Sequence, residues 1–116
     1  MDLDTGEYDG RVVVALRGEP DVADAASVAA ALMEVAARER ETIVDLAGLE
    51  FIDSSGLAAL VLARKHARRA GGDLLLAAPQ QQVLRVLTIT RLLDVFTVYA
   101  SVKAAGAAGV LAVPAA

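Results

Sequence analysis

The sequence predicts an α/β fold: a mixed, mostly parallel sheet of four to five strands, flanked by about four helices. Three observations lead to this expectation. Short aliphatic and β-branched runs alternate with longer segments whose apolar residues recur at helical spacing. Each intervening segment is long enough to join two parallel strands through a helix. With 116 residues the chain makes one domain, and its core must be aliphatic, because 56% of the residues are hydrophobic and only 3% are aromatic.

Local signals predict where the strands and helices of the chain begin and end. In order, we expect strands over residues 3–8, 10–19, 42–49, 73–78 and 94–100, and helices over residues 20–41, 54–70, 79–90 and 101–111. The dipeptide Asp9-Gly10 suits a tight hairpin turn between the first two strands. Asp21 can cap the first helix, whose apolar residues recur on one face. Ile43, Val44 and Leu46 are expected to be buried in the strand that follows.

Glycine and proline mark the elements of the second half. The helix after Asp53 ends in a basic cluster, and Gly71 suits the left-handed cap position behind it. Pro79 opens the next helix. Its apolar residues should face inward, and these are Val83, Leu84, Leu87 and Ile89. Two glycines weaken the last helix.

Composition and charge exclude several classes of protein. The 11 basic and 15 acidic residues give a net charge of −4, whereas a nucleic-acid-binding protein needs a concentrated positive surface. The absence of cysteine removes disulfides, thiolate metal sites and thiol catalysis. The N-terminus does not resemble a signal peptide, and no apolar segment reaches the roughly 18 residues of a membrane span. We therefore expect a cytoplasmic protein without a cofactor, a nucleic-acid partner or a membrane span.

The stretch Asp53-Ser54-Ser55-Gly56 lies between a strand and a helix, at the sheet edge where open α/β folds place their sites. The simplest interpretation is that Asp53 or Ser54 caps the helix and has no further role. A nucleotide-binding loop is not supported, because the stretch has one glycine and no Lys-Ser or Lys-Thr after it. Nearby acidic residues show no recognisable metal-ligand spacing.

The spacing also excludes a serine nucleophile activated by this chain. His66 is the only histidine and lies eleven residues beyond Ser55 on the same predicted helix, or about 16 Å along its axis. A general base must come within about 3 Å of the proton that it takes. Phosphorylation of Ser54 or Ser55 by another protein fits better, because free N–H groups and the helix dipole accept an anion at a helix N-terminus.

The segment VDLAGLEFIDSSGLAALV, with GEPD upstream and GGDLLLAAPQQQVLRVLTITRLLDVFTVY downstream, resembles the STAS family, and in particular its stand-alone anti-sigma factor antagonists. The similarity covers about residues 3–105 of a single domain over 1–116, with an alanine-rich tail over 100–116. It implies a mixed sheet flanked by helices. It also implies a bacterial, non-enzymatic regulator of transcription that binds an anti-sigma factor, which is a serine protein kinase of the histidine-kinase-like ATPase type, and so frees a sigma factor.

The same resemblance implies a phosphoswitch. The kinase would phosphorylate Ser54, with Ser55 as the second choice, and a PP2C-type phosphatase would reverse the modification. We expect partner contacts at Asp21, Asp53, Ser55, Gly56, Leu57 and Arg64. Pro20 and Arg91 depart from the family pattern, and Arg91 must turn the chain where a glycine is common. The alternative is a STAS subunit of a lipid-transport ABC complex or of a stressosome-like scaffold, which acts by protein contact without a phosphoswitch.

Overall fold

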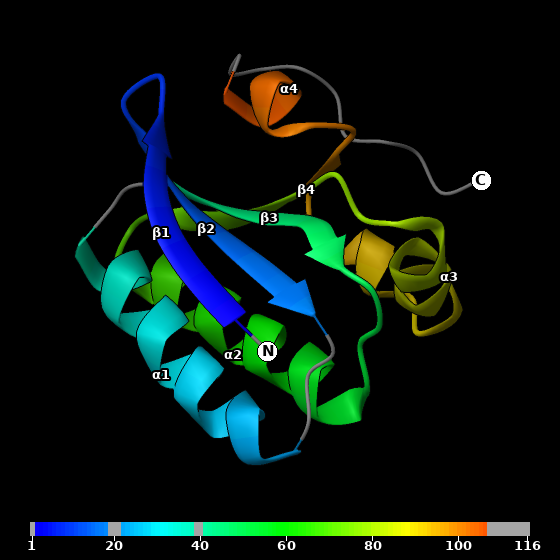
Figure 1. Cartoon of the computed structure of the whole chain (residues 1–116). Helices are drawn as coiled ribbons and strands as arrows, with labels where there is room; N and C mark the ends of the chain where they lie inside the picture. The colour runs from blue at the N-terminus through cyan, green and yellow to red at the C-terminus, as the bar shows by residue number, and fades with distance from the viewer. Residues whose placement is uncertain (1, 19–21, 39–40, 107–116) are drawn as a thin grey trace.

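A computed structural model describes residues 2–18, 22–38 and 41–106 of the chain. Its elements alternate between strands and helices after an initial hairpin (Figure 1). In chain order they are β1 (Asp2–Tyr8), β2 (Arg11–Gly18), α1 (Val22–Arg38), β3 (Glu41–Leu49), α2 (Ser54–Arg69), β4 (Asp73–Ala77), α3 (Gln81–Ile89), the 3-10 helix η1 (Leu92–Asp94), β5 (Val98–Tyr99) and α4 (Val102–Gly106).

The five strands form one sheet in the order β1-β2-β3-β4-β5. The β1–β2 pair is antiparallel, and the other three pairs are parallel. This confirms the predicted mixed, mostly parallel sheet. The hairpin turn is also confirmed: Asp9 and Gly10 both have positive φ, 51° and 82°, which the tightest two-residue hairpin turns require.

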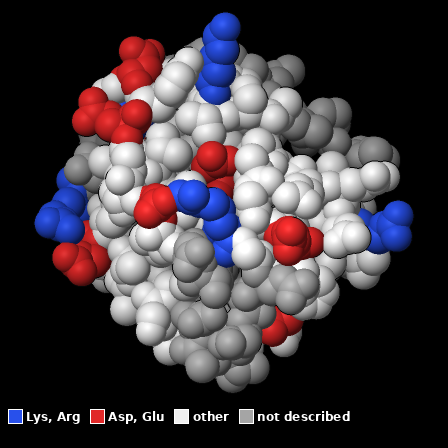
Figure 2. Space-filling model, in the orientation of Figure 1, with Lys and Arg blue, Asp and Glu red and all other residues white. Residues whose placement is uncertain are grey.

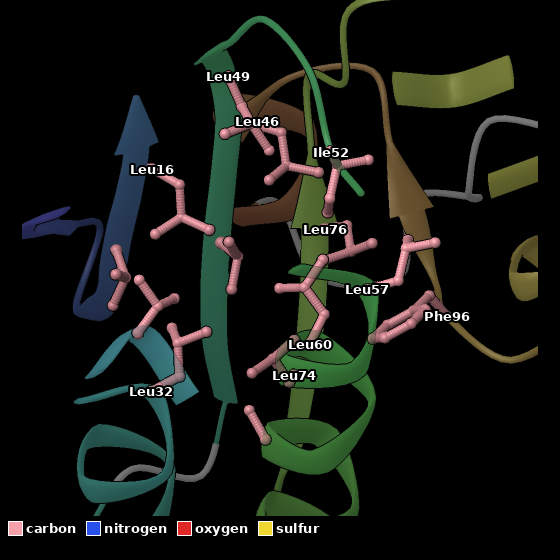
Figure 3. Close-up of a cluster of buried hydrophobic side chains, with 14 of the residues drawn as sticks. Leu16, Leu32, Leu46, Leu49, Ile52, Leu57, Leu60, Leu74, Leu76 and Phe96 are labelled. Atoms are coloured by element: carbon pink, nitrogen blue, oxygen red, sulfur yellow. The ribbon is translucent and has the colours of Figure 1, made fainter. Parts of the chain in front are cut away.

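The main core lies between the sheet and the helices α1 and α2, which pack side by side on one face of the sheet (Figure 1). Figure 3 shows leucine and isoleucine side chains filling this space, with Phe96 as the one labelled aromatic. A smaller cluster covers the opposite face beneath α4. Because both faces of the central strands are covered, β3 and β4 carry nearly continuous apolar runs, as expected for buried parallel strands.

The helix α4 is tied to the sheet by the hairpin. Arg11 donates from Nε to Glu41 Oε1 at 2.9 Å and from a terminal nitrogen to the carbonyl oxygen of Gly106 at 2.7 Å. The ring of Tyr8 lies so close to Gly106 that a Cβ atom there would come within 2.8 Å of it. Glycine at this position therefore allows the helix and the ring to pack closely.

Three expectations for the second half of the chain are wrong. The helix α3 begins at Gln81 and not at Pro79, and Ile89 is 73% exposed rather than buried. Ile89 follows Leu87 by two residues, about 200° around the helix, so the two side chains cannot share a face. The strand predicted over 94–100 is reduced to Val98–Tyr99, because the chain turns through η1 first.

The sequence also singled out several turn and cap residues, and the structure describes Gly71 and Arg91 among them. Gly71 has a φ of +89° behind α2, as predicted for a left-handed cap. Arg91 has a φ of 63° and does make the turn without glycine's freedom. Asp21, Pro20 and the tail beyond Gly106 lie outside the described residues.

Candidate functional site

The start of α2 is a capped helix N-terminus. The Asp53 side chain accepts a hydrogen bond from the Gly56 backbone nitrogen at 2.9 Å, and the Asp53 carbonyl oxygen accepts one from the Leu57 nitrogen at 2.9 Å. Asp53 is therefore the N-cap, and Ser54 and Ser55 are the first two residues of the helix. This decides between the two residues that the sequence left open as caps.

Burial separates the two serines. Ser54 is exposed, whereas Ser55 is half-buried, and the next two residues, Gly56 and Leu57, are buried. A Cβ atom on Gly56 would lie 2.8 Å from Cγ1 of Ile52, so the glycine allows the first turn of the helix to pack against the preceding loop. An enzyme that approaches this turn from solvent therefore meets Ser54 before Ser55.

The loop before the cap is fixed at both of its sides. The Glu50 nitrogen donates to the carbonyl oxygen of Gly18 at 3.1 Å, which ties the loop to the end of β2. The Gln80 side chain donates from Nε2 to the carbonyl oxygen of Ala47 at 2.7 Å, which ties the end of β3 to the start of α3. Sequence reasoning missed the role of Gln80, since its partner is 33 residues away along the chain. These bonds hold the turn in place independently of the two serines.

An exposed aromatic side chain stands beside the turn. Phe51 lies two residues before Asp53 and is 47% exposed, whereas Phe96, the other phenylalanine, is buried. Phe51 is not among the residues predicted from the sequence. The signal that was available is an aromatic residue in a loop of a chain with only two phenylalanines and two tyrosines. Such a side chain can anchor a partner protein, because aromatic residues carry much of the binding energy of interfaces.

The structure places Arg64 far from this turn. Arg64 lies ten residues beyond Ser54 on α2, about 15 Å along the helix axis. Its Nε atom is 3.7 Å from Oδ1 of Asp73, and its guanidinium carbon is 6.0 Å from the centre of the Phe96 ring. Asp73 also accepts a hydrogen bond from Arg68 at 3.2 Å. Arg64 therefore makes contacts within the chain that join α2 to the start of β4.

The described residues provide no catalytic pair at the turn. His66 lies on α2, eleven residues after Ser55, so the two residues are about 16 Å apart along the helix axis. Across residues 2–18, 22–38 and 41–106, no three His, Cys, Asp or Glu side chains gather in a group that could hold a metal ion. Figure 2 shows acidic and basic side chains interspersed on the face that it displays, with no concentrated positive surface there.

One further finding concerns membranes. Within the described ranges, no helix combines the length and the apolar character needed to cross a bilayer.

Comparison with known proteins gives the same fold and a consistent family. A family model described as the STAS domain matches residues 2–105. The chain is 34% identical over 115 residues to a Bordetella bronchiseptica protein named "Putative anti-sigma factor antagonist BtrV", covering 98% of this chain and 99% of that protein.

Three solved structures show the fold. The crystal structure of an anti-sigma factor antagonist from Mycobacterium paratuberculosis superposes with a TM-score of 0.81 at 24% identity, covering 94% of this chain and 92% of that one. The anti-sigma factor antagonist SpoIIAA in its unphosphorylated form gives a TM-score of 0.73 at 20% identity, over 90% and 93% of the two chains. The phosphorylated form of the Bacillus protein SpoIIAA gives 0.68 at 19% identity, over 90% and 96%.

Proposed function

Because this chain belongs to the STAS domain family, we propose that it acts as an anti-sigma factor antagonist that is switched off by phosphorylation of Ser54. The observation that carries the proposal is an exposed serine at the first position of a helix whose cap is supplied by another residue, Asp53. The full-length match to BtrV supports an antagonist over a subunit of a transport complex or scaffold. SpoIIAA, described in unphosphorylated and phosphorylated forms, supports a switch of this kind.

The geometry explains why a phosphate would change binding rather than folding. A phosphoserine carries a charge of about −1.5 to −2, and a helix N-terminus stabilises an anion through its N–H groups and dipole. The cap of α2 uses the Asp53 side chain and not the Ser54 hydroxyl, so modification of Ser54 leaves the cap in place. The new charge would stand beside the Asp53 carboxylate on the exposed side of the turn. A partner that packs closely on this turn would be repelled.

The proposed partner is an anti-sigma factor that is also a serine kinase of the histidine-kinase-like ATPase type, and a PP2C-type phosphatase would restore binding. Ser54 and Phe51 offer exposed surface to that partner, whereas Gly56 and Leu57 are buried and act by shaping the turn. We also propose contacts from Asp53, from Ser55 and from Asp21, which lies outside the described residues. We leave Arg64 out of this surface because its contacts are made within the chain.

Two substitutions at Ser54 test the proposal. Ser54→Ala should still bind the anti-sigma kinase but should not be released by ATP, and Ser54→Asp should bind poorly because it places a charge on the turn. Ser55→Ala removes the hydroxyl of the second-choice acceptor and one proposed contact, so it should weaken binding somewhat, but ATP should still release the chain because Ser54 remains. The measurements are the affinity for the kinase with and without ATP, and mass spectrometry of the segment 53–64. A chain that leaves the kinase on addition of ATP without gaining phosphate in this segment would contradict the phosphoswitch.

A further inference from the structure

We infer that the partner docks along the outer face of α2 and that it contributes an amphipathic helix with apolar residues followed by acidic ones. This inference rests on the proposed function, because it takes the anti-sigma kinase as the occupant. It adds how the partner segment is oriented along α2 and which kinds of side chain it presents. Three observations support it: an exposed line of residues that runs from Ser54 to the apolar Leu62, a groove near the far end of that line, and positive charge there that pairs with no other described residue.

The apolar line follows from helical spacing. Ser54, Ala58 and Leu62 are four residues apart on α2, so they lie one above another on one side of the helix. All three are exposed, and Leu62 has 51% of its surface accessible. An exposed leucine alone needs no explanation. This one lies two helical turns from the candidate phosphoacceptor and on the same face, which makes it a natural second contact for a protein that covers Ser54.

A shallow groove lies beyond the far end of this line, at His66, between the two helices that lie next to each other in Figure 1. Its volume is about 560 Å³, and its walls are mostly apolar. The lining residues are Ala30, Met33, Glu34, Ala37 and Arg38 from α1, and His66 from α2. His66 follows Leu62 by four residues and so lies on the same side of α2. Small alanine side chains on α1 leave room for a partner side chain to enter the groove.

The far end of α2 is positive on a chain whose net charge is −4. Arg64 and Arg68 are paired with Asp73, and Arg38 is paired with Glu34. Lys65 and Arg69 are exposed, lie four residues apart on one side of the helix, and make no ion pair with any other described residue. Their natural complement is acidic. The sequence analysis expected a partner contact at Arg64; because Arg64 and Arg68 both contact Asp73, we assign the docking charge to Lys65 and Arg69.

These features fix how the partner segment is oriented. Ser54 and Arg69 are fifteen residues apart, about 22 Å along the axis, which a partner helix of about four turns can span. The acidic end of that helix would lie over Lys65 and Arg69, and its other end would meet Ser54. Phosphorylation would then place its charge at the edge of the docked surface, without requiring any change in the surface itself.

The test compares substitutions on this face with matched substitutions on α3. We would measure the affinity of the unphosphorylated chain for the anti-sigma kinase of its own genome, by titration calorimetry at two salt concentrations. Leu62→Ala should weaken binding about tenfold, as expected for loss of an apolar anchor. Lys65→Glu with Arg69→Glu should weaken it at least as much and should reduce its salt dependence. The controls Ile89→Ala and Arg85→Glu change exposed residues of α3 and should stay within about twofold of the unsubstituted chain.

The outcomes separate this inference from the proposed function. Binding by the unsubstituted chain, with Leu62→Ala and the double charge reversal within about twofold of it, would overturn the inference and leave the antagonist function standing. Failure of the unsubstituted chain to bind the kinase would overturn both. Analytical ultracentrifugation that shows a dimer lost in Leu62→Ala would assign the face to a second copy of the chain, and so would also overturn the inference. Unchanged thermal unfolding of each variant shows that loss of binding is not loss of fold.

Discussion

The helices α2 and α3 both begin at the same edge of the sheet, but their ends are built differently. In α2, the Asp53 side chain caps the first turn, and Gly71 takes the left-handed conformation behind the last one. In α3, the N-cap Gln80 makes no cap bond with its side chain, which instead reaches Ala47. The turn behind α3 is made by Arg91 with a φ of 63°, a conformation that glycine adopts without strain.

This difference indicates that α2 is determined mainly by local sequence and α3 mainly by tertiary packing. The ends of α2 are set by residues within a few positions of the ends themselves, so its N-terminus is fixed by local sequence. In contrast, α3 follows few of these local rules and depends on the packing of Val83 and Leu87 against the main core. The helix that presents Ser54 is therefore the one whose geometry should survive binding and modification unchanged. Substitutions in the core should break α3, and substitutions at the ends should break α2.

The largest effect should come from removing the buried anchor of α3. Leu87 is fully buried, so Leu87→Ala should lower the free energy of unfolding by about 2–5 kcal/mol, through lost apolar contact and the cavity left behind. Urea unfolding measures this loss, and hydrogen exchange should show that the amides of α3 open before those of α2. Leu84→Ala, at a half-buried position on the same helix, should cost clearly less. Equal costs at the two positions would contradict a helix held by its inner face.

At the start of α2, the close contact of Gly56 with Ile52 should give the next largest effect. Gly56→Ala would place a Cβ atom 2.8 Å from Ile52 Cγ1, and we expect this overpacking to cost about 1–3 kcal/mol. The matched control is Gly6→Ala in β1, where an added Cβ atom would meet nothing within 4 Å. That substitution should be neutral or slightly stabilising in the same urea experiment. A Gly56→Ala variant as stable as Gly6→Ala would show that the turn yields easily.

The cap itself should contribute a smaller amount. Asp53→Ala removes the acceptor for the Gly56 nitrogen, and we expect a loss of about 1 kcal/mol. Asp53→Asn keeps an acceptor of the same shape without the charge, so most of the stability should return. Thermal unfolding of the two variants separates the hydrogen bond from the charge. If Asp53→Asn were as destabilised as Asp53→Ala, the negative charge and not the hydrogen bond would hold the turn.

The same contrast accounts for what the sequence could reveal in advance. The hairpin turn at Asp9-Gly10 and the glycine behind α2 were predictable, because each depends on the conformational freedom of the residues at that position. The exposure of Ile89 could also have been found, because its position relative to Leu87 follows from helix geometry. The contact from Gln80 to Ala47 and the pairing of Arg64 with Asp73 could not, because both join segments distant in sequence. The sequence located the candidate site through its helix cap. The contacts that support the site could be found only from the fold.

The smallest effects on stability are expected at the residues that follow the C-termini of α2 and α3. Arg91 adopts a left-handed conformation that costs a side-chain-bearing residue energy, so Arg91→Gly should raise the free energy of unfolding by about 0.5–1 kcal/mol. Gly71→Ala makes the opposite exchange behind α2 and should lower it by about 1 kcal/mol, since an added Cβ atom there meets nothing within 4 Å and only the backbone conformation is penalised. Opposite signs at the two sites, measured by thermal unfolding, would show that backbone conformation and not side-chain contact sets both ends. A loss of stability in Arg91→Gly would instead mean that the arginine side chain makes a contact that offsets its strained backbone.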